Sequence, residues 1–177
     1  MGAIRWTITM KIRIVLLAAL AISTTASAGD LADLTGRASV IDGDTIEIQG
    51  QRIRLNGIDA PESWQTCKDA AGKTYRCGKD AAFALADFLN ASQPISCLAV
   101  SMDRYRRTVA DCFRSDRGPV NGWLVRQGWA VDWVRYSKGE YASEQAEARS
   151  ARRGIWQGDF QKPCEARAKR SKRSPSC

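Results

Sequence analysis

Residues 40–62, VIDGDTIEIQGQRIRLNGIDAPE, predict the beginning of an antiparallel sheet. From residue 38 onward the apolar residues follow a period of two, which places alternate side chains on one face of a strand. Gly50 marks a turn between two of these runs. The alternating residues are Ala38, Val40, Ile46, Ile48, Ile53 and Leu55.

The same stretch carries five carboxylates and two arginines, an unusual charge content for strands that bury one face. Arg54 alternates with Ile53 and Leu55, so its side chain should project from the face opposite the core. Asp44 lies in the turn that enters one strand, and Asp59 follows another. These charged residues are therefore candidates for a functional site.

The rest of the chain predicts one helix between strands and further helices after them. In residues 79–92 the apolar period changes to that of an amphipathic helix, and strands are expected near residues 95–101 and 107–114. Further helices are expected at residues 119–128 and near 140–153. This order indicates an α+β fold, and we predict an OB-fold: a five-stranded β-barrel with about three α-helices.

The N-terminus has the features of a secretory signal peptide. Basic residues precede an apolar run at residues 14–22, and an A-x-A cleavage motif ends at Ala28. We predict a signal peptide at residues 1–28 and an exported protein, periplasmic or secreted, with no stable membrane association after cleavage. An uncleaved membrane anchor is the alternative, and Met10 is an alternative start.

The mature chain is expected to comprise a domain at residues 29–161 and a basic tail at residues 162–177. The whole chain has a net charge of +8, yet residues 29–161 carry 18 basic and 18 acidic side chains. The basic excess therefore belongs to the leader and the tail, and composition alone does not make the domain a nucleic-acid binder. The tail lacks an apolar run, so we predict that it is disordered, either solvated or weakly attracted to phosphate.

The six cysteines favour disulfides over a metal site. The chain has no C-x-x-C pair and no histidine, which disfavours zinc, and export to an oxidising compartment favours disulfides. We predict that Cys67 and Cys77 close a small polar loop, and that Cys97 and Cys112 face each other across two strands. The two cysteines of the tail could pair with each other, link a dimer or remain free.

The lack of histidine also excludes several hydrolase mechanisms, namely Ser-His-Asp, Cys-His and His-pair ribonuclease chemistry. Carboxylates, tyrosine, lysine and metal-bound water remain for proton transfer. Asp44 and Asp59, brought together from different strands, would repel each other unless a cation lay between them, and oxygen ligands favour Ca²⁺ or Mg²⁺. The alternative is that Asp42, Gly43 and Asp44 only form a polar turn.

Arg54 and Arg107 add a second component to this candidate site. Two guanidiniums beside a carboxylate-bound cation suit a phosphodiester, whose negative charge grows when water attacks it. Either arginine alone could instead be a surface salt-bridge partner. Together with the aspartates, the two arginines predict a site for a cation and a phosphodiester.

Five motifs in this chain resemble the staphylococcal nuclease family and occur in the same order. They are VIDGDTIEI, IRLNGIDAPE, DRYRRTVA, NGWLVRQGWA and QAEARSARRGIW, and they cover about residues 36–157. The resemblance implies an OB-fold and a calcium-dependent phosphodiesterase with one calcium ion per chain. It also implies cleavage of DNA and RNA with little sequence preference, leaving 3′-phosphates.

The resemblance implies a metal site built from three protein ligands. Asp44 and Asp59 correspond to the calcium carboxylates, and the Ala60 carbonyl corresponds to the third ligand. Asp42 corresponds to a residue that supports these ligands without contacting the metal.

The resemblance also implies three catalytic residues. Arg54 and Arg107 correspond to the arginines that bind the phosphate, and Glu62 corresponds to the general base or water-orienting residue. On this basis Glu62→Gln and Arg54→Ala are expected to leave folding intact and to suppress cleavage.

Two tyrosines correspond to substrate contacts. Tyr105 resembles a tyrosine that reaches a substrate phosphate, and Tyr136 aligns with one on the base-binding surface, where Trp133 is a rival. The chain departs from the family pattern at Arg106, which stands where the family has glycine. A backbone geometry with positive φ would therefore be strained at Arg106.

Two other function classes remain open. One is a nucleic-acid-binding module that uses the same fold without effective catalysis. The other is an accessory factor in exopolysaccharide biosynthesis or plasmid maintenance. For the main hypothesis the partners are DNA and RNA substrates, and we expect a monomer.

Overall fold

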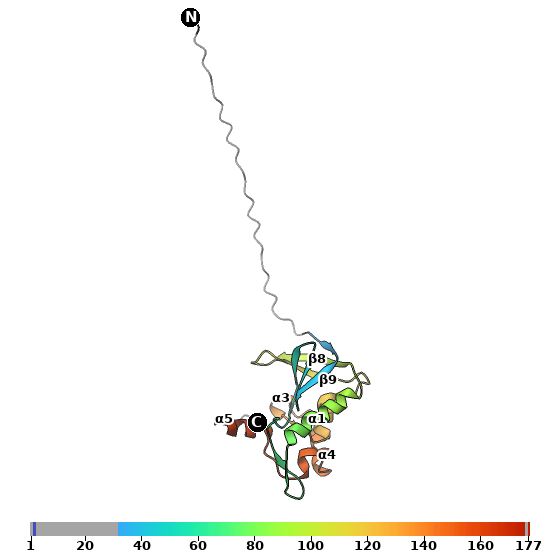
Figure 1. Ribbon diagram of the computed structural model, residues 1–177, viewed down its shortest axis with the longest axis vertical. Coiled ribbons are helices and arrows are strands. Elements are labelled where there is room, and N and C mark those ends of the chain that lie inside the picture. The colour runs from blue at the N-terminus through green and yellow to red at the C-terminus, as the bar shows by residue number, and fades with distance from the viewer. Residues whose placement is uncertain (1, 3–31, 176) are drawn as a thin grey trace. The chain divides into compact units, whose positions relative to one another are not determined.

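The computed structural model describes residues 2, 32–175 and 177, so the predicted signal peptide lies outside this part of the chain apart from Gly2 (Figure 1). Six strands form the main sheet of the described residues, in the order β1-β8-β9-β4-β3-β2. Neighbours are antiparallel except β4 and β9, which run parallel. The strands are β1 (Leu34–Gly36), β2 (Ala38–Asp42), β3 (Thr45–Ile48), β4 (Gln51–Leu55), β8 (Ile95–Met102) and β9 (Thr108–Phe113).

The sheet closes because β1 and β2 are consecutive in the chain yet stand at opposite ends of the strand order. Only Arg37 separates them, and β1 pairs with β8 while β2 pairs with β3. They therefore act as one bent strand that joins both edges, which gives five strands around a barrel. The predicted α+β class with an OB-fold barrel is confirmed.

The alternating apolar residues of the opening stretch line the barrel core. Ile46 and Ile48 of β3 and Ile53 and Leu55 of β4 are all at most 1% exposed. Full burial of each such side chain contributes about 1.5–3 kcal/mol. These four residues pack in one cluster with the inner face of α1, which explains why this stretch sets the fold.

Helices and short strand pairs surround the barrel, and Figure 1 shows α1, α3 and α4 below β8 and β9. The predicted helices at 79–92, 119–128 and 140–153 correspond to α1, α2 and α4, with ends that differ by a few residues. The helices α3, η1 and α5 were not predicted. The helices are α1 (Cys77–Asn90), α2 (Val120–Arg126), α3 (Val134–Ser137), α4 (Ala142–Ser150), the 3₁₀ helix η1 (Gly154–Gln157) and α5 (Pro163–Ser171). The short pairs are β5 (Ile58–Asp59) with β10 (Val131–Asp132), and β6 (Cys67–Lys68) with β7 (Thr74–Tyr75).

Both predicted disulfides are confirmed. Cys67–Cys77 joins β6 to the first residue of α1, and Cys97–Cys112 connects directly opposed residues of β8 and β9. The third bridge, Cys164–Cys177, closes the C-terminal segment on itself. Of the options left open for the tail cysteines, mutual pairing is therefore the one that the structure contains.

The prediction of a disordered tail was wrong, because residues 163–171 form α5 and bury one of its faces. The buried residues are small, Ala166 and Ala168 with Pro163 and Cys164, so no run of large apolar side chains signalled them. Pro163 also occupies a favourable position in the first turn of the helix. None of the helices in the described part of the chain is long and apolar enough to span a bilayer.

Candidate active site

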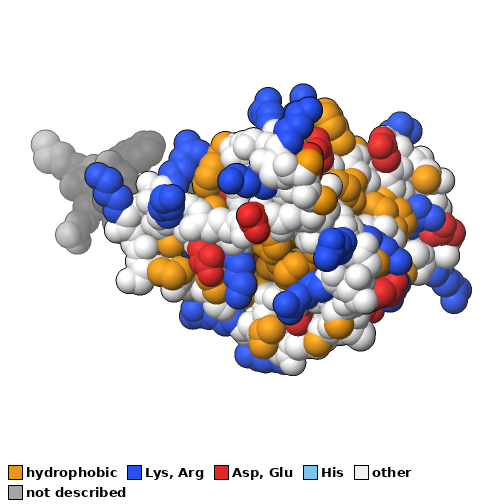
Figure 2. Space-filling model, turned by 90° about the horizontal axis from the view of Figure 1, so that it is seen from below, with side chains coloured by type: hydrophobic (Ala, Val, Ile, Leu, Met, Phe, Trp, Pro, Cys, Tyr) orange, Lys and Arg blue, Asp and Glu red, His pale blue; other side chains and the backbone are white. Residues whose placement is uncertain are grey.

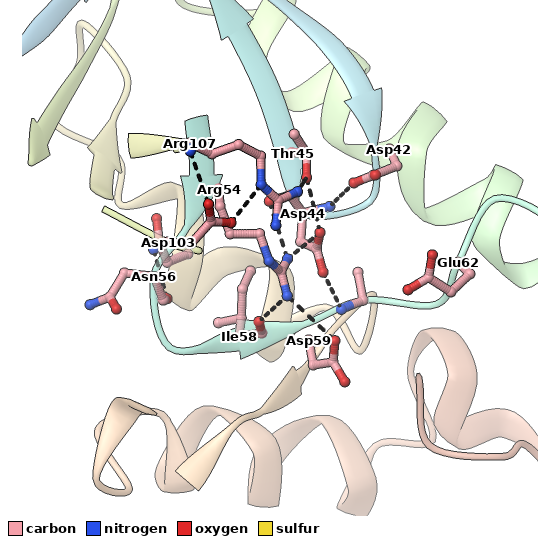
Figure 3. A network of polar contacts seen from close by, with 12 residues as sticks. Asp42, Asp44, Thr45, Arg54, Asn56, Ile58, Asp59, Glu62, Asp103 and Arg107 are labelled. Atoms are coloured by element: carbon pink, nitrogen blue, oxygen red, sulfur yellow. Dashed lines mark hydrogen bonds and ion pairs between the residues drawn. The ribbon is translucent and has the colours of Figure 1, made fainter. Parts of the chain in front are cut away.

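The opening stretch brings its charged residues together from the turn between β2 and β3 and from the strands β4 and β5 (Figure 3). Asp44 lies in the turn between β2 and β3, and Asp59 is the last residue of β5. Arg54 on β4 lies opposite Thr45 on β3 in the strand register. A turn and two strands therefore position a guanidinium between two carboxylates.

Asp44 is almost completely buried and fully engaged. Its Oδ1 forms an ion pair with Arg54 and accepts a hydrogen bond from the Thr45 hydroxyl at 3.3 Å. Its Oδ2 accepts a hydrogen bond from the Ala60 backbone N–H at 2.8 Å. Asp42 does form the polar turn, because its Oδ1 accepts from the Asp44 N–H at 3.1 Å. The turn thus serves to orient Asp44 toward β4 and β5.

Arg54 points away from the barrel core, as predicted, but it is not a surface residue, because its side chain is only 11% exposed. Its Nη1 donates to the Asp44 carbonyl oxygen at 3.3 Å, and its Nη2 donates to the Ile58 carbonyl oxygen at 3.1 Å and to Asp59 Oδ1 at 3.4 Å. Burial lowers the pKa of Arg54 to about 10, against the opposing effect of Asp59. The guanidinium therefore remains charged near neutral pH and balances two buried carboxylates.

Glu62 follows Asp59 by three residues and is held through its backbone. The Gln65 side chain accepts from the Glu62 N–H at 3.3 Å, and the Gln65 N–H donates to the Glu62 carbonyl at 2.7 Å. A Cβ atom on Gly78 would lie 1.7 Å from the Glu62 carbonyl oxygen, so the start of α1 approaches this loop as only glycine allows. The Glu62 carboxylate lies to one side of the Arg54 network in Figure 3.

Arg107 reaches the same site from the loop between β8 and β9. Its Nε donates to Asp103 Oδ2 at 2.7 Å, and its Nη1 donates to the Thr45 hydroxyl at 3.5 Å. Burial acts to raise the pKa of Asp103, but the hydrogen bonds from Arg107 and neighbouring backbone outweigh it and lower that pKa. Thr45 thus connects Arg107 to Asp44, and the two predicted phosphate-binding arginines come from neighbouring parts of the sheet, Arg54 from β4 and Arg107 from the residue before β9.

The loop that presents Arg107 contains one residue in the left-handed backbone conformation, although that residue is not glycine. Arg106 has φ of 63°, the conformation for which the sequence pattern predicted strain. Tyr105 is 66% exposed, and the guanidinium carbon of Arg107 lies 5.8 Å from the centroid of its ring. A cleft of about 300 Å³ opens beside this loop, lined by Arg52, Arg106 and Arg107 among others.

The two aromatic candidates occupy different places. Tyr136 on α3 is 54% exposed and contacts the edge of Trp133, with ring centroids 4.5 Å apart. Trp133 is closer to the charged groups, because the guanidinium carbon of Arg54 lies 5.8 Å from its ring centroid. Tyr136 therefore adjoins the site through Trp133 rather than directly.

Sequence reasoning missed Arg167 of α5, which contacts two of the predicted site residues. Its Nη1 donates to Asp59 Oδ1 at 2.7 Å and to Glu62 Oε1 at 2.8 Å, and its Nη2 donates to Asp59 Oδ2 at 3.1 Å. Burial acts to lower the pKa of Arg167, but the bonds to Asp59 and Glu62 outweigh it and raise that pKa. The only sequence signal was the pair of cysteines that brackets this segment.

The residues present suit a hard cation. Asp44 and Asp59 are buried, contact the same guanidinium and offer only oxygen donors, the chemistry that Ca²⁺ prefers. Within the described residues no group of three or more Cys, Asp or Glu side chains surrounds one metal position. A cation here would therefore depend on these two carboxylates, on a backbone oxygen such as that of Ala60, and on water.

The chain is similar to known proteins both as a family and individually. Residues 52–158 match the model described as Staphylococcal nuclease homologue, which is more than half of the chain. The matched region includes Arg54, Asp59, Glu62 and Arg107, and it ends before α5 begins. Arg167 therefore lies outside the matched family domain.

Three relatives illustrate the range of similarity. The succinoglycan biosynthesis protein ExoI of Rhizobium meliloti is 51% identical over 157 residues, which are 89% of this chain and 82% of that protein. An uncharacterized endonuclease of Escherichia coli O157:H7 is 34% identical over 131 residues, 71% of this chain and 78% of that protein. A micrococcal nuclease of Shigella flexneri is 31% identical over 132 residues, 66% of this chain and 70% of that protein.

Proposed function

The chain belongs to the staphylococcal nuclease family, and from this premise we propose that it is an exported, calcium-dependent nuclease. It hydrolyses the phosphodiester bonds of DNA and RNA with low sequence specificity and leaves 3′-phosphates. The observation that carries this proposal is the gathering of Asp44, Asp59, Arg54 and Arg107 around one strand end, with Glu62 beside them.

Asp44, Asp59 and the Ala60 carbonyl would hold the calcium ion. When bound, this ion supplies positive charge that stabilises the negative charge developing on the phosphate. Asp44 is already oriented by the protein, because Ala60 and Thr45 donate hydrogen bonds to its carboxylate. The burial of Asp44 and Asp59 would keep competing water away from the carboxylate oxygens that such an ion would use.

Side chains of the protein carry out phosphate binding and proton transfer. Arg54 and Arg107 bind the non-bridging phosphate oxygens and stabilise the pentacovalent transition state. Glu62 accepts a proton from water while the water oxygen bonds to phosphorus in line with the leaving group. The bond from phosphorus to the 5′-oxygen breaks, that oxygen takes up a proton from solvent water, and the phosphate remains on the 3′-oxygen.

Substrate contacts outside the scissile phosphate are sequence-independent in this proposal. Tyr105, exposed beside Arg107, donates a hydrogen bond from its hydroxyl to a phosphate oxygen, while Tyr136 and Trp133 offer surfaces on which bases stack. In Figure 2, Lys and Arg side chains that can attract a polyanion lie around a hydrophobic area near the middle of the face shown, interspersed with Asp and Glu. Such contacts recognise phosphate and ring surfaces, which all nucleotides share.

A cleavage assay on circular DNA and on single-stranded RNA tests the proposal. The purified chain should cut both with calcium and neither with a chelator, and Glu62→Gln should lower the rate roughly 100-fold or more. Glu47→Gln on β3 is the matched control and should cleave at the wild-type rate. Cleavage that persists in chelator, or an equally active Glu62→Gln variant, would contradict the proposal.

The proposed location of the protein is outside the cytoplasm. The predicted signal peptide and the three disulfides of the structure both suit an oxidising compartment. The mass of the protein recovered from the periplasm or medium should correspond to cleavage after Ala28. Recovery of the uncleaved chain from the cytoplasm would exclude export.

A second candidate function follows from the 51% identity to ExoI, which is named for succinoglycan biosynthesis. In this alternative the chain supports production of an exopolysaccharide, with or without cleavage of nucleic acid. Deleting the gene should then lower the yield of the polymer, and complementation with Glu62→Gln shows whether this role requires cleavage of nucleic acid. Restoration of the yield by this variant would show a role that is independent of catalysis.

A further inference from the structure

Besides Arg54, a second guanidinium contacts the Asp59 carboxylate that a cation would need. Arg167 donates to both oxygens of Asp59 and to Oε1 of Glu62, at distances between 2.7 and 3.1 Å. Asp59 is fully buried, whereas the Arg167 side chain is 34% exposed. Arg167 therefore covers the solvent side of a carboxylate that is otherwise enclosed by the protein.

Helix α5 is docked rather than loosely attached. Its buried face consists of Pro163, Cys164, Ala166 and Ala168, and the Cys164–Cys177 bridge closes the segment that contains it. Just before the helix, the Gln161 carbonyl accepts a hydrogen bond from the Gln65 side chain at 2.6 Å. These contacts hold the α5 backbone in place, so Arg167 meets the site at a high effective concentration.

Arg167 and a divalent cation cannot share these oxygens. Calcium lies at about 2.3–2.6 Å from its oxygen ligands, and a guanidinium hydrogen-bonded to the same oxygens would both block and repel it. A guanidinium that binds a carboxylate through two parallel hydrogen bonds is also among the stronger charge pairs in proteins. Cation binding must therefore displace Arg167 from Asp59.

We propose that α5 is an autoinhibitory element, in which Arg167 competes with the divalent cation for Asp59 while it also pairs with Glu62. This inference rests on the proposed binding of calcium by Asp44 and Asp59. The bridge between Cys164 and Cys177 makes the competition sensitive to redox state. With the bridge intact Arg167 remains beside Asp59, and once the bridge is reduced the helix detaches more readily and the cation binds more tightly.

Calcium titration by calorimetry tests the competition without depending on cleavage. Arg167→Gln should bind calcium roughly 10-fold more tightly than the wild type, because the charge-assisted pair no longer has to break. Arg167→Lys retains the charge but loses the planar pair of donors, so its affinity should lie between the two. Arg170→Gln is the matched control on the same helix, where its guanidinium lies over Trp64, and its affinity should stay within about 2-fold of wild type.

A double variant, Cys164→Ser with Cys177→Ser, tests the bridge while leaving both other disulfides intact. Its calcium affinity should rise several-fold toward that of Arg167→Gln. In chelator, Arg167→Gln should unfold at a lower temperature than wild type, and calcium should raise its unfolding temperature more than that of wild type.

The outcomes distinguish this inference from the function on which it rests. If wild type and Arg167→Gln bind calcium with equal affinity, the competition is refuted while calcium binding stands. If neither binds calcium although both remain folded in chelator, the proposed metal site is itself wrong and the inference fails with it. If the double serine variant binds calcium as the wild type does, the role of the bridge is refuted.

Discussion

Replacement of Arg54 by alanine should destabilise the protein strongly, and calcium should reverse much of the loss. The guanidinium is the counter-charge shared by Asp44 and Asp59, and it also satisfies the backbone carbonyls of Asp44 and Ile58. From sequence alone this variant was expected to fold normally. The burial of Arg54 changes that expectation, because removing it leaves two buried carboxylates without their partner.

The magnitude follows from the contacts that would be lost. Removing one partner of a buried ion pair costs about 3–5 kcal/mol. Arg167 still faces Asp59 in the variant, and Asp44 keeps its hydrogen bond from Ala60, so we expect the lower end, about 3 kcal/mol. That is a large part of the 5–15 kcal/mol that typically separates folded and unfolded states.

Urea unfolding followed by circular dichroism measures this change. The free energy of unfolding of Arg54→Ala should fall by about 3 kcal/mol in chelator and by clearly less with excess calcium, because a bound cation neutralises the same carboxylates. Arg52→Ala, on the same strand but exposed, is the control and should change stability by less than about 0.5 kcal/mol. A loss below about 1 kcal/mol in chelator, or a loss that calcium does not reduce, would refute the reasoning.

Three further changes test other parts of the structure. Arg106→Gly should raise the free energy of unfolding by about 1 kcal/mol in urea titrations, because glycine adopts φ of 63° without strain; an unchanged or lower value would show that Arg106 is not strained. Gly78→Ala should lower stability by about 1–3 kcal/mol and slow DNA cleavage, because the new Cβ displaces the Glu62 backbone; wild-type melting and cleavage would contradict that contact. In the folded protein the pKa of Asp103 lies below its usual value. The hydrogen bonds from Arg107 to the Asp103 carboxylate therefore contribute their full stability at pH values above the pKa of Asp103 in the unfolded chain. This contribution is lost as the pH falls through the pKa of Asp103 in the folded protein. Unfolding free energies measured from about pH 5 to pH 2 should therefore fall more steeply for wild type than for Asp103→Asn, and parallel profiles would exclude this contribution.

The fold was largely predictable because its signals are local. Alternation of Ile46, Ile48, Ile53 and Leu55 predicts strands wherever one face is buried, and these residues do line the barrel core. Cys97 and Cys112 flank a loop between two short predicted strands, so their bridge could also be predicted from local sequence. The tail was mispredicted because Ala166 and small neighbours bury little area, and their helix depends on contacts with distant parts of the chain.

The sequence alone determined which chemical groups are available: carboxylates and arginines on a hairpin, no histidine, and cysteines suited to disulfides. Periodicity and motif order were enough to predict that Asp44, Arg54 and Asp59 would come together. Only the tertiary structure decided that Arg54 is buried between the two carboxylates and that Arg167 covers Asp59. For Arg167 the physical reason is separation along the chain, because it lies 108 residues from Asp59 and 105 from Glu62. For Arg54 the reason is tertiary packing around the residue, which alternation along a strand does not reveal. Periodicity reports only the local environment of each residue, whereas the partner of a charge is set by packing between distant elements.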